Sequence, residues 1–288
     1  MPESLVSRFT TLPDLHQNPR YAKSMGEIGW TTIGDPGSYL YLRPLGPLSI
    51  GKLQHPDHLD LAWVKKVRKQ YHLVTTYIEP GLKQPDLGKV GLATEPFANS
   101  ATSLVDLTLT EQKLLSSFKQ KTRYNILYAE RKNNIKIVTK QFRDLTTSDL
   151  ETFKTSRDNW SKRKGVVGYE ERFLLAILEY FGDSGWLHLA YRGDNCVGTL
   201  MIIKNNKSAI YYSAFAEPVG YSLFAPTLLT WVAMTIAKAA HCTIFDFGGI
   251  YDGRYPKMYK KWQGFTKFKE GFSPTVVTYP PTQLLLGW

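Results

Sequence analysis

Apolar and polar residues alternate along the chain in segments of two kinds, some with the spacing of a helix and some with that of a strand. Asn18-Pro19 is a start signal for a first helix, because asparagine caps helices and proline fits their first turn. Predicted helices cover residues 19–28, 58–70, 111–132, 147–159, 169–180 and 226–240, and predicted strands cover residues 39–42, 71–78, 104–109, 135–139, 186–191, 196–204, 208–215 and 243–247. This order predicts an α/β (α+β) fold with helices on both faces of the sheet.

A second series of alternating strands and helices begins at Ile135. We therefore expect two mixed domains, residues 1–143 and residues 144–288. The charged helix over residues 111–132 ends the first of them and is expected at the junction between the two.

The sequence has a formal net charge of +11, and most of the excess lies in the middle of the chain. Residues 113–164 contain 14 lysines and arginines against 5 aspartates and glutamates. A clustered surplus of positive charge attracts polyanions such as nucleic acid, anionic lipid head groups or phosphorylated substrates. A solubilising surface explains the same charge, so both interpretations stay open on composition alone.

Several classes of protein are disfavoured by the same sequence. Cys196 and Cys242 form neither a disulfide framework nor a metal-binding set, and both are expected to be buried thiols. The six histidines include one close pair, His55 and His58, so no metal site is predicted. No apolar stretch of about 18 residues predicts a membrane span, and the N-terminus lacks an apolar signal core, so we expect a cytoplasmic protein.

Four segments carry a more specific signal through their order and spacing. They are Gln17-Asn18-Pro19-Arg20-Tyr21-Ala22 followed by Gly29-Trp30, then Lys121-Thr122-Arg123-Tyr124-Asn125-Ile126 with Ala129 and Arg131, then Ser161-Lys162-Arg163-Lys164-Gly165-Val166, and finally Phe245-Asp246-Phe247-Gly248-Gly249-Ile250 followed by Tyr259-Lys260-Lys261. In this order they resemble the Fem (FemABX) family of tRNA-dependent aminoacyltransferases, which build peptidoglycan interpeptide bridges.

The resemblance implies two N-acetyltransferase-like (GNAT) domains, of which the first is shortened after Trp30, and no coiled-coil arm. The second domain is expected to carry most of the active site. The implied reaction moves an amino acid from aminoacyl-tRNA to the amine of a precursor peptide, either nucleotide-linked (UDP-MurNAc-peptide) or lipid-linked. Aminoacyl-tRNA is a co-substrate, no further cofactor is expected, and the protein is expected to be a monomer, with possible peripheral contact at the inner membrane face.

Aminolysis of an activated ester requires alignment, stabilisation of the oxyanion and removal of a proton, rather than a protein nucleophile. On this basis, and by the resemblance, we expect three groups of residues to act in the reaction. Lys260, Tyr212 and Glu79 are expected in catalysis; Arg163, Lys164, Trp30, Tyr259 and Asp246 in substrate binding; and Lys121, Arg123, Arg131 and Lys261 in binding tRNA or another polyanion.

Each of these roles has a structural alternative. For Lys260 the alternative is an exposed lysine in a basic stretch, and for Tyr212 it is a buried tyrosine on a strand. For Glu79 the alternative is the stronger interpretation, because a carboxylate in a turn is usually solvated. The cations of the helix over residues 111–132 are explained by ion pairs between domains. Lys260 is the preferred catalytic cation, because a fixed ammonium beside the reacting ester stabilises the oxyanion.

Two other functions remain as alternatives. An acyl-CoA-dependent N-acyltransferase would share the fold, but residues 218–226 lack the Gly-rich loop that holds a pyrophosphate at a helix start. A non-catalytic protein that binds RNA or an anionic surface would explain the charge of the middle of the chain. It would not explain the segment from Phe245 to Lys261.

Overall fold

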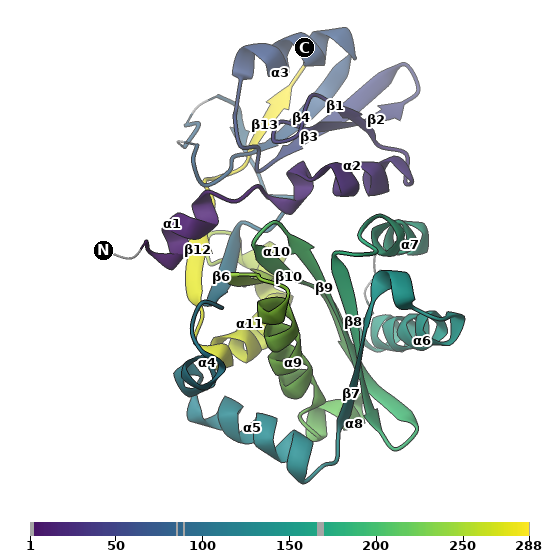
Figure 1. The fold of residues 1–288 in the computed structure, drawn as a ribbon. Coiled ribbons are helices and arrows are strands. Elements are labelled where there is room, and N and C mark those ends of the chain that lie inside the picture. The colour runs from purple at the N-terminus through teal and green to yellow at the C-terminus, as the bar shows by residue number, and fades with distance from the viewer. Residues whose placement is uncertain (1–2, 85, 89, 166–169, 288) are drawn as a thin grey trace.

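A computed structural model of the protein shows two mixed β-sheets that lie one beyond the other along the molecule (Figure 1). The structure describes residues 3–84, 86–88, 90–165 and 170–287. Val166 of the third motif and the predicted first residue of the helix over 169–180 therefore lie outside the described residues.

The first sheet has six strands, in the order β1 (Thr31–Ile33), β2 (Leu40–Leu45), β3 (Leu48–Gln54), β4 (Leu73–Glu79), β13 (Gln283–Leu286) and β5 (Leu92–Ala93). β3 and β4 are parallel, and α3 (Leu61–Gln70) connects them. Val64 of α3 packs with Leu53 and Ile78 of the sheet, which gives this half an apolar core of its own.

The second sheet has seven strands, in the order β12 (Thr275–Thr278), β6 (Ala101–Asp106), β11 (Ile244–Gly249), β10 (Ser208–Ala216), β9 (Asn195–Asn205), β8 (Gly185–Arg192) and β7 (Lys136–Gln141). β10 and β11 are parallel, and the segment between them contains α8 (Pro218–Ser222) and α9 (Ala225–Ala239). The other neighbouring strands of this sheet are antiparallel.

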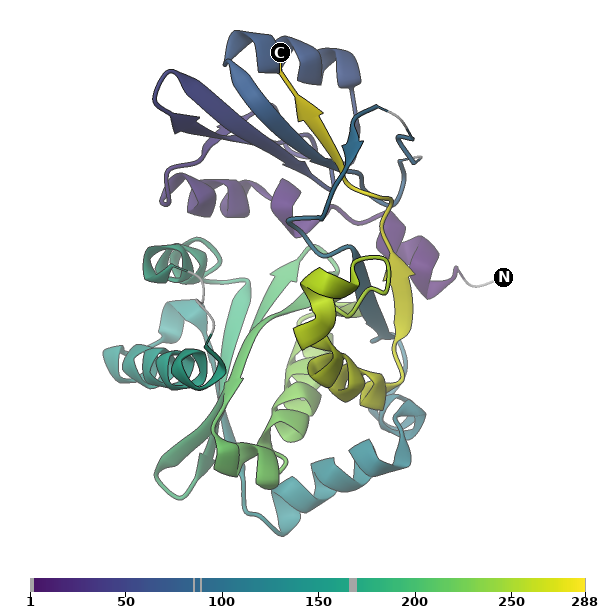
Figure 2. The ribbon, with the colours of Figure 1, turned by 180° about the vertical axis from the view of Figure 1, so that it is seen from behind.

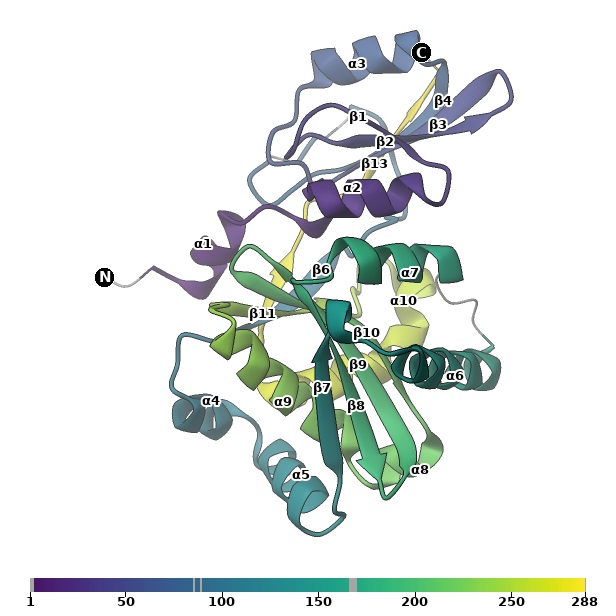
Figure 3. The same cartoon turned by 45° about the vertical axis from the view of Figure 1, so that its right-hand side comes forward.

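Helices cover both faces of the second sheet (Figure 3). On one face, α4 (Glu111–Ser117), α5 (Gln120–Arg131) and α9 bury Leu114, Ile126 and Met234 against the strands. On the other face, α6 (Thr147–Lys164) and α7 (Glu171–Tyr180) bury Phe153 and Ile177. The predicted α/β class with helices on both faces is therefore confirmed.

The two halves also share a core. α2 (Pro19–Gly26), capped by Asn18 as predicted, packs on α7, and the ring of Tyr21 meets Phe173 edge-on with centroids 5.8 Å apart. Asn18 Nδ2 also donates to Asn205 Oδ1 at 2.8 Å. The N-terminal segment is thus held against the second sheet.

The sheets do not divide the chain at residue 143. β6 precedes this position but pairs with β11 and β12 in the second sheet, where five of its residues, 101–105, are buried. β13 comes near the end of the chain but lies between β4 and β5 in the first sheet. Each sheet therefore takes strands from both sides of residue 143. The division into domains 1–143 and 144–288 stays a prediction.

The single helix predicted over residues 111–132 is two helices, α4 and α5. Phe118 ends α4 in an extended conformation and is buried, with its ring 5.1 Å from that of Phe272. Burial of this side chain turns the backbone out of the helix. α5 then packs on α9, at the end of the molecule that lies away from the first sheet in Figure 1.

Shorter elements complete the fold, and they are α1 (Leu5–Thr10), η1 (Leu15–Gln17), η2 (Phe142–Asp144), α10 (Pro256–Tyr259), η3 (Lys260–Trp262), α11 (Gln263–Lys269) and η4 (Glu270–Phe272). Seen from behind (Figure 2), the yellow-green segment with α10 and α11 lies against the second sheet, between its green strands and the yellow strand β12. Among the described residues, no helix has both the length and the apolar character needed to cross a bilayer. Cys196 is half-buried and Cys242 buried, and both are free thiols.

Gly220 in α8 provides a test of this packing. A Cβ added there would lie 2.0 Å from the Val197 carbonyl oxygen, whereas a Cβ at Gly264 in α11 would meet nothing within 4 Å. We expect Gly220→Ala to lower the free energy of unfolding by about 1–3 kcal/mol through overpacking. Gly264→Ala should leave it unchanged or raise it by up to about 1 kcal/mol, because alanine is the better helix former. Urea unfolding followed by circular dichroism measures both, and equal effects would contradict the packing of α8.

Candidate functional site

A cavity of about 1290 Å³ lies where the N-terminal segment meets the second sheet. Residues 9–10, 12–16, 55–57 and 81–83 line it on one side, and β10 and the end of β11 line it on the other. The volume exceeds the roughly 300–1,000 Å³ of ordinary small-molecule pockets. It is therefore large enough for a ligand bigger than an ordinary small molecule.

The cavity extends into a gap between two parallel strands. β10 and β11 pair from Ser208 with Ile244 as far as Ile210 with Asp246, and no further. Beyond Asp246, β11 also slips in register against β6, and Gly248 takes a left-handed conformation with φ of 65°. The last residues of β11 are therefore free of regular pairing with β10.

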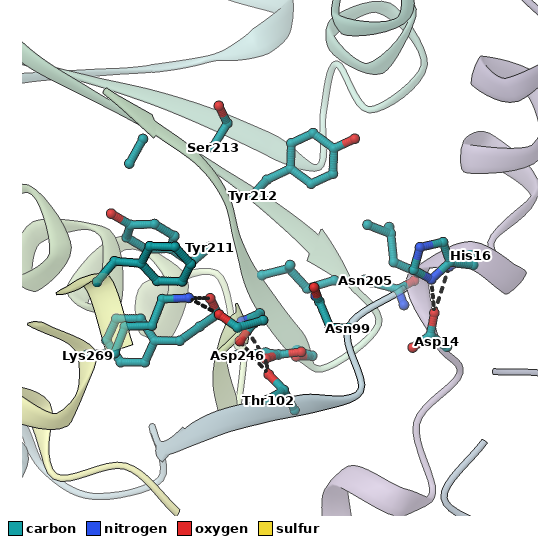
Figure 4. A pocket seen from close by; sticks show the side chains of 18 of the residues that line it. Asp14, His16, Asn99, Thr102, Asn205, Tyr211, Tyr212, Ser213, Asp246 and Lys269 are labelled. Carbon is teal, nitrogen blue, oxygen red and sulfur yellow. Dashed lines mark hydrogen bonds and ion pairs between the residues drawn. The ribbon is translucent and has the colours of Figure 1, made fainter. Parts of the chain in front are cut away.

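Asp246 stands at the point where the strands separate. Its Oδ1 accepts hydrogen bonds from the Thr102 hydroxyl and, at 2.8 Å, from the Gly248 amide (Figure 4). Burial raises the pKa of Asp246 to about 6, although these two hydrogen bonds and Lys269 act to lower it. The carboxyl group therefore changes its charge in the neutral range.

Lys269, at the end of α11, extends its amine to the same strand end. Nζ donates to the carbonyl oxygens of Phe247 at 2.8 Å and Gly249 at 2.5 Å. It also lies 4.8 Å from the ring centroid of Phe265 and 5.8 Å from that of Tyr211. Burial lowers the pKa of Lys269 to about 7, against the opposing effect of Asp246. A buried amine with such a pKa is a marker of functional sites.

Gly249 allows this packing because it has no side chain. A Cβ at this position would lie 2.3 Å from Asn99 Oδ1 and 2.4 Å from the Trp262 ring. The absence of a side chain at Gly249 thus leaves room for Asn99, Trp262 and the amine of Lys269.

The other end of the cavity is reached from α6. Trp160 and Lys164 line it together with Phe215 of β10, whose ring centroid lies 5.5 Å from that of Trp160. Arg157 also lines the cavity, and its NH2 group pairs with Asp158 at 2.8 Å and Glu171 at 3.7 Å. The cavity thus combines an apolar and aromatic wall with cations at this end.

The sequence around this site matches a known family. A model of the FemAB family matches residues 194–282, a segment that contains β9 to β11, α11, Asp246 and Lys269. Within this region the chain is similar to the FemAB family. The resemblance proposed from the motifs is thereby confirmed, and we call residues 194–282 the FemAB region. A comparison with curated protein sequences found no match.

Solved structures show the same fold along nearly the whole chain. The crystal structure of FemX matches with a TM-score of 0.77 at 12% identity, over 96% of this chain and 94% of that one. The C-terminal domain of a proposed lysylphosphatidylglycerol synthetase from Agrobacterium fabrum matches with a TM-score of 0.66 at 16% identity, over 94% and 88%. A tandem GNAT protein from the clavulanic acid biosynthesis pathway matches with a TM-score of 0.56 at 9% identity, over 97% and 91%. The predicted tandem GNAT-like fold is confirmed.

The structure brings some of the predicted residues to the cavity and not others. Four of them line it: Tyr212, Lys164, Asp246 and Lys261. Eight do not: Lys260, Glu79, Arg163, Trp30, Tyr259, Lys121, Arg123 and Arg131. In Figure 4, Tyr212 lies on the opposite side of β10 from Tyr211 and Lys269.

Lys260 lies outside the cavity because of its neighbour in the chain. Tyr259 is fully buried and packs on Trp262, with ring centroids 4.4 Å apart, while its hydroxyl donates to the Ala98 carbonyl at 3.3 Å. Helical spacing then turns the next side chain, Lys260, outward, and it is exposed. Lys269, and not Lys260, lines the cavity.

Glu79 is buried at the end of β4 rather than solvated in a turn. Its Oε2 accepts from Gln54 Nε2 at 2.8 Å, and its Oε1 accepts from the Ala98 amide at 2.6 Å. Both oxygens thus hold parts of the fold together. Trp30 is half-buried beside the first sheet, where the amine of Lys52 lies 4.6 Å from its ring centroid.

The remaining predicted cations do not line the cavity. Arg163 forms an ion pair with Glu217 and donates to the Ala216 carbonyl at 2.7 Å. Arg123 donates to the carbonyls of Ser116 and Phe118, and so satisfies the end of α4. Lys121 and Arg131 are exposed on α5.

Lys269 was not among the residues that the sequence singled out. It follows Phe268 in a basic stretch, and its burial in the fold distinguishes it from the exposed Lys260. Asp14, His16 and His55 also line the cavity, and no sequence spacing pointed to them.

The raised pKa of Asp246 predicts how stability depends on pH. Between the unperturbed pKa of 3.8 and the folded value of about 6, the folded protein keeps a proton that the unfolded chain releases. The stability associated with this group is therefore fully present below pH 4 and is lost as the pH rises to 6, by about 3 kcal/mol in total. Asp246→Asn should lack this loss. Its free energy of unfolding in urea, relative to that of the wild type, should therefore rise between pH 4 and pH 7. Parallel pH dependences would contradict the burial of this carboxyl group.

Proposed function

We propose that the chain transfers an aminoacyl group from aminoacyl-tRNA to an amine of a peptidoglycan precursor peptide, as in the formation of an interpeptide bridge. The observation that carries this proposal is the buried amine of Lys269, held at the open end of β11 beside Asp246. Both residues belong to the FemAB region and line the cavity.

The reaction places specific demands on these two groups. The acceptor amine attacks the ester carbonyl, a C–N bond forms, and the C–O bond to the tRNA breaks. The ammonium of Lys269 can stabilise the negative charge that develops on the carbonyl oxygen, because buried cations interact strongly with a nearby anion. Asp246, which ionises above its pKa of about 6, can accept the proton that the attacking amine loses and pass it to the 3′ oxygen of the departing tRNA.

The size and charge of the cavity also support two large substrates. Lys164 and Lys261 are exposed and line the cavity. Cations in such positions suit the phosphates of a precursor or of the 3′ end of tRNA. Because charged tRNA is found in the cytoplasm, we place the reaction there, at or near the inner face of the membrane if the precursor is lipid-linked.

An acyl-CoA donor is less well supported. The stretch that a pyrophosphate loop would occupy contains α8, and its Gly220 packs tightly on the backbone of Val197. Phe224 precedes α9 without a side-chain cap. Neither feature forms a Gly-rich cradle at a helix start.

Replacement of Lys269 tests the assignment. We expect Lys269→Met to lower the rate of transfer about 10²–10³-fold, the range seen when one oxyanion-stabilising group is removed. Lys260→Met, an equally conservative change at an exposed position outside the cavity, should leave the rate within about twofold of the wild type. Circular dichroism checks that both variants fold. Loss of transfer in Lys260→Met with full activity in Lys269→Met would reverse the assignment.

The product identifies the reaction. The protein is incubated with a mixture of charged tRNAs and, in separate arms, UDP-MurNAc-peptide, a lipid-linked precursor, or phosphatidylglycerol vesicles. The expected result is a precursor whose mass increases by one or more amino-acid residues, in proportion to the tRNA discharged. Discharge onto phosphatidylglycerol alone, or acylation that requires CoA thioesters, would refute the proposed acceptor or donor.

A further inference from the structure

Three metal-ligating side chains converge on the wall of the cavity, apart from Lys269. Asp14 precedes η1, His16 lies within it, and His55 follows the end of β3. His16 Nδ1 lies 2.6 Å from Asp14 Oδ1, and His55 Nδ1 lies 3.0 Å from Asp14 Oδ2. One ligand atom from each of the three residues lies within 4.8 Å of the other two. Figure 4 shows Asp14 and His16 facing each other at the side of the pocket away from Lys269.

Packing fixes the directions of these side chains. The ring of His55 stacks on Tyr279, with centroids 3.8 Å apart and an interplanar angle of 2°. The ring of His16 meets Tyr21 edge-on at 5.1 Å. Asp14 caps η1 by accepting from the His16 amide at 2.9 Å. Ligands held in this way lose little freedom when an ion binds, which favours binding.

We propose that Asp14, His16 and His55 bind one divalent transition-metal ion, for which zinc is the best chemical fit. Two imidazoles and one carboxylate form a ligand set used by zinc sites that keep a fourth position open. In this protein the open position faces the cavity, where a water molecule or an oxygen of a bound substrate would complete the coordination.

The distances require only a small adjustment. Zinc bonds of about 2.0–2.2 Å with tetrahedral angles separate neighbouring ligand atoms by about 3.4 Å. The two contacts to Asp14 would therefore lengthen by roughly 0.4–0.8 Å, which side-chain rotation can supply. A ring nitrogen that binds the metal must carry no proton, so any proton on Nδ1 of His16 or His55 would have to leave that nitrogen.

The charges around the cluster favour a cation. Asp14, Glu79 and Asp246 all stabilise positive charge at His55, against the cost of burying it. The same charges also favour a protonated histidine. The experiment must therefore distinguish a site that binds a metal ion from a site that holds only protons. The proposal does not depend on the proposed transfer reaction, because it concerns the protein without substrates.

Metal binding is tested with tag-free full-length protein, stripped with a chelator and titrated with zinc by calorimetry. We expect one zinc ion per chain at micromolar or lower Kd, and a weakening of at least tenfold in both His16→Gln and His55→Gln. Glutamine can still donate a hydrogen bond to Asp14, so these variants keep the local contact. His58→Gln, which alters an exposed histidine outside the cluster, should bind as the wild type does.

Cobalt gives a second measurement on the unaltered protein. One equivalent of Co²⁺ should produce the visible absorption bands of a four- or five-coordinate ion with nitrogen ligands, and zinc should displace it. No zinc uptake and no such bands, or binding that is unchanged in both histidine variants, would overturn the proposal. If the variants fail to fold, the cobalt spectrum of the wild type decides the question.

Discussion

A buried amine needs hydrogen-bond acceptors, and this requirement links the sequence of the FemAB region to its site. β10 and β11 stop pairing after Asp246, and the turn at Gly248 leaves the carbonyl oxygens of Phe247 and Gly249 without strand partners on that side. The amine of Lys269 satisfies both of them. Without the lysine these carbonyls would be buried and unpaired, and without the open strand the lysine would have no place in the core.

The same opening determines where the cavity lies. The gap between the two strands exposes β10 on one side and the end of β11 on the other, and α2 and η1 from the N-terminal segment border the space. α2 is fixed by its packing on α7, and β13 ties the end of the chain into the first sheet. The cavity therefore has walls from distant parts of the sequence, and its shape depends on the shared core between the two halves.

Local signals in the sequence were enough to predict most of the helices and strands. Asn18-Pro19 predicts the start of α2, and alternation predicts β8 to β11, because these signals act over a few residues. The break between α4 and α5 was not predictable in this way. No glycine or proline marks it, and it results from the burial of Phe118 against Phe272, more than 150 residues away in the chain. β12 and β13 were missed because their pairing partners, β6 and β4, are equally distant.

Only some of the residues that line the cavity were predicted, again because local signals do not show which distant segments the fold brings together. Asp246 was found because its motif is contiguous, whereas Lys269 lies in a basic stretch where lysines are ordinarily exposed, and its burial depends on β11. The cluster of Asp14, His16 and His55 combines two segments about 40 residues apart that only the fold brings together.

The central claim, that Lys269 has a buried amine with a lowered pKa at the open end of β11, is tested most directly by NMR titration of the lysine side chains. In protein labelled with ¹³C- and ¹⁵N-lysine, one Nζ signal should titrate near pH 7, and this signal should be absent from Lys269→Met. If every lysine of the wild type titrated close to the ordinary value of about 10.4, the amine would be solvated and the account of the site would be wrong.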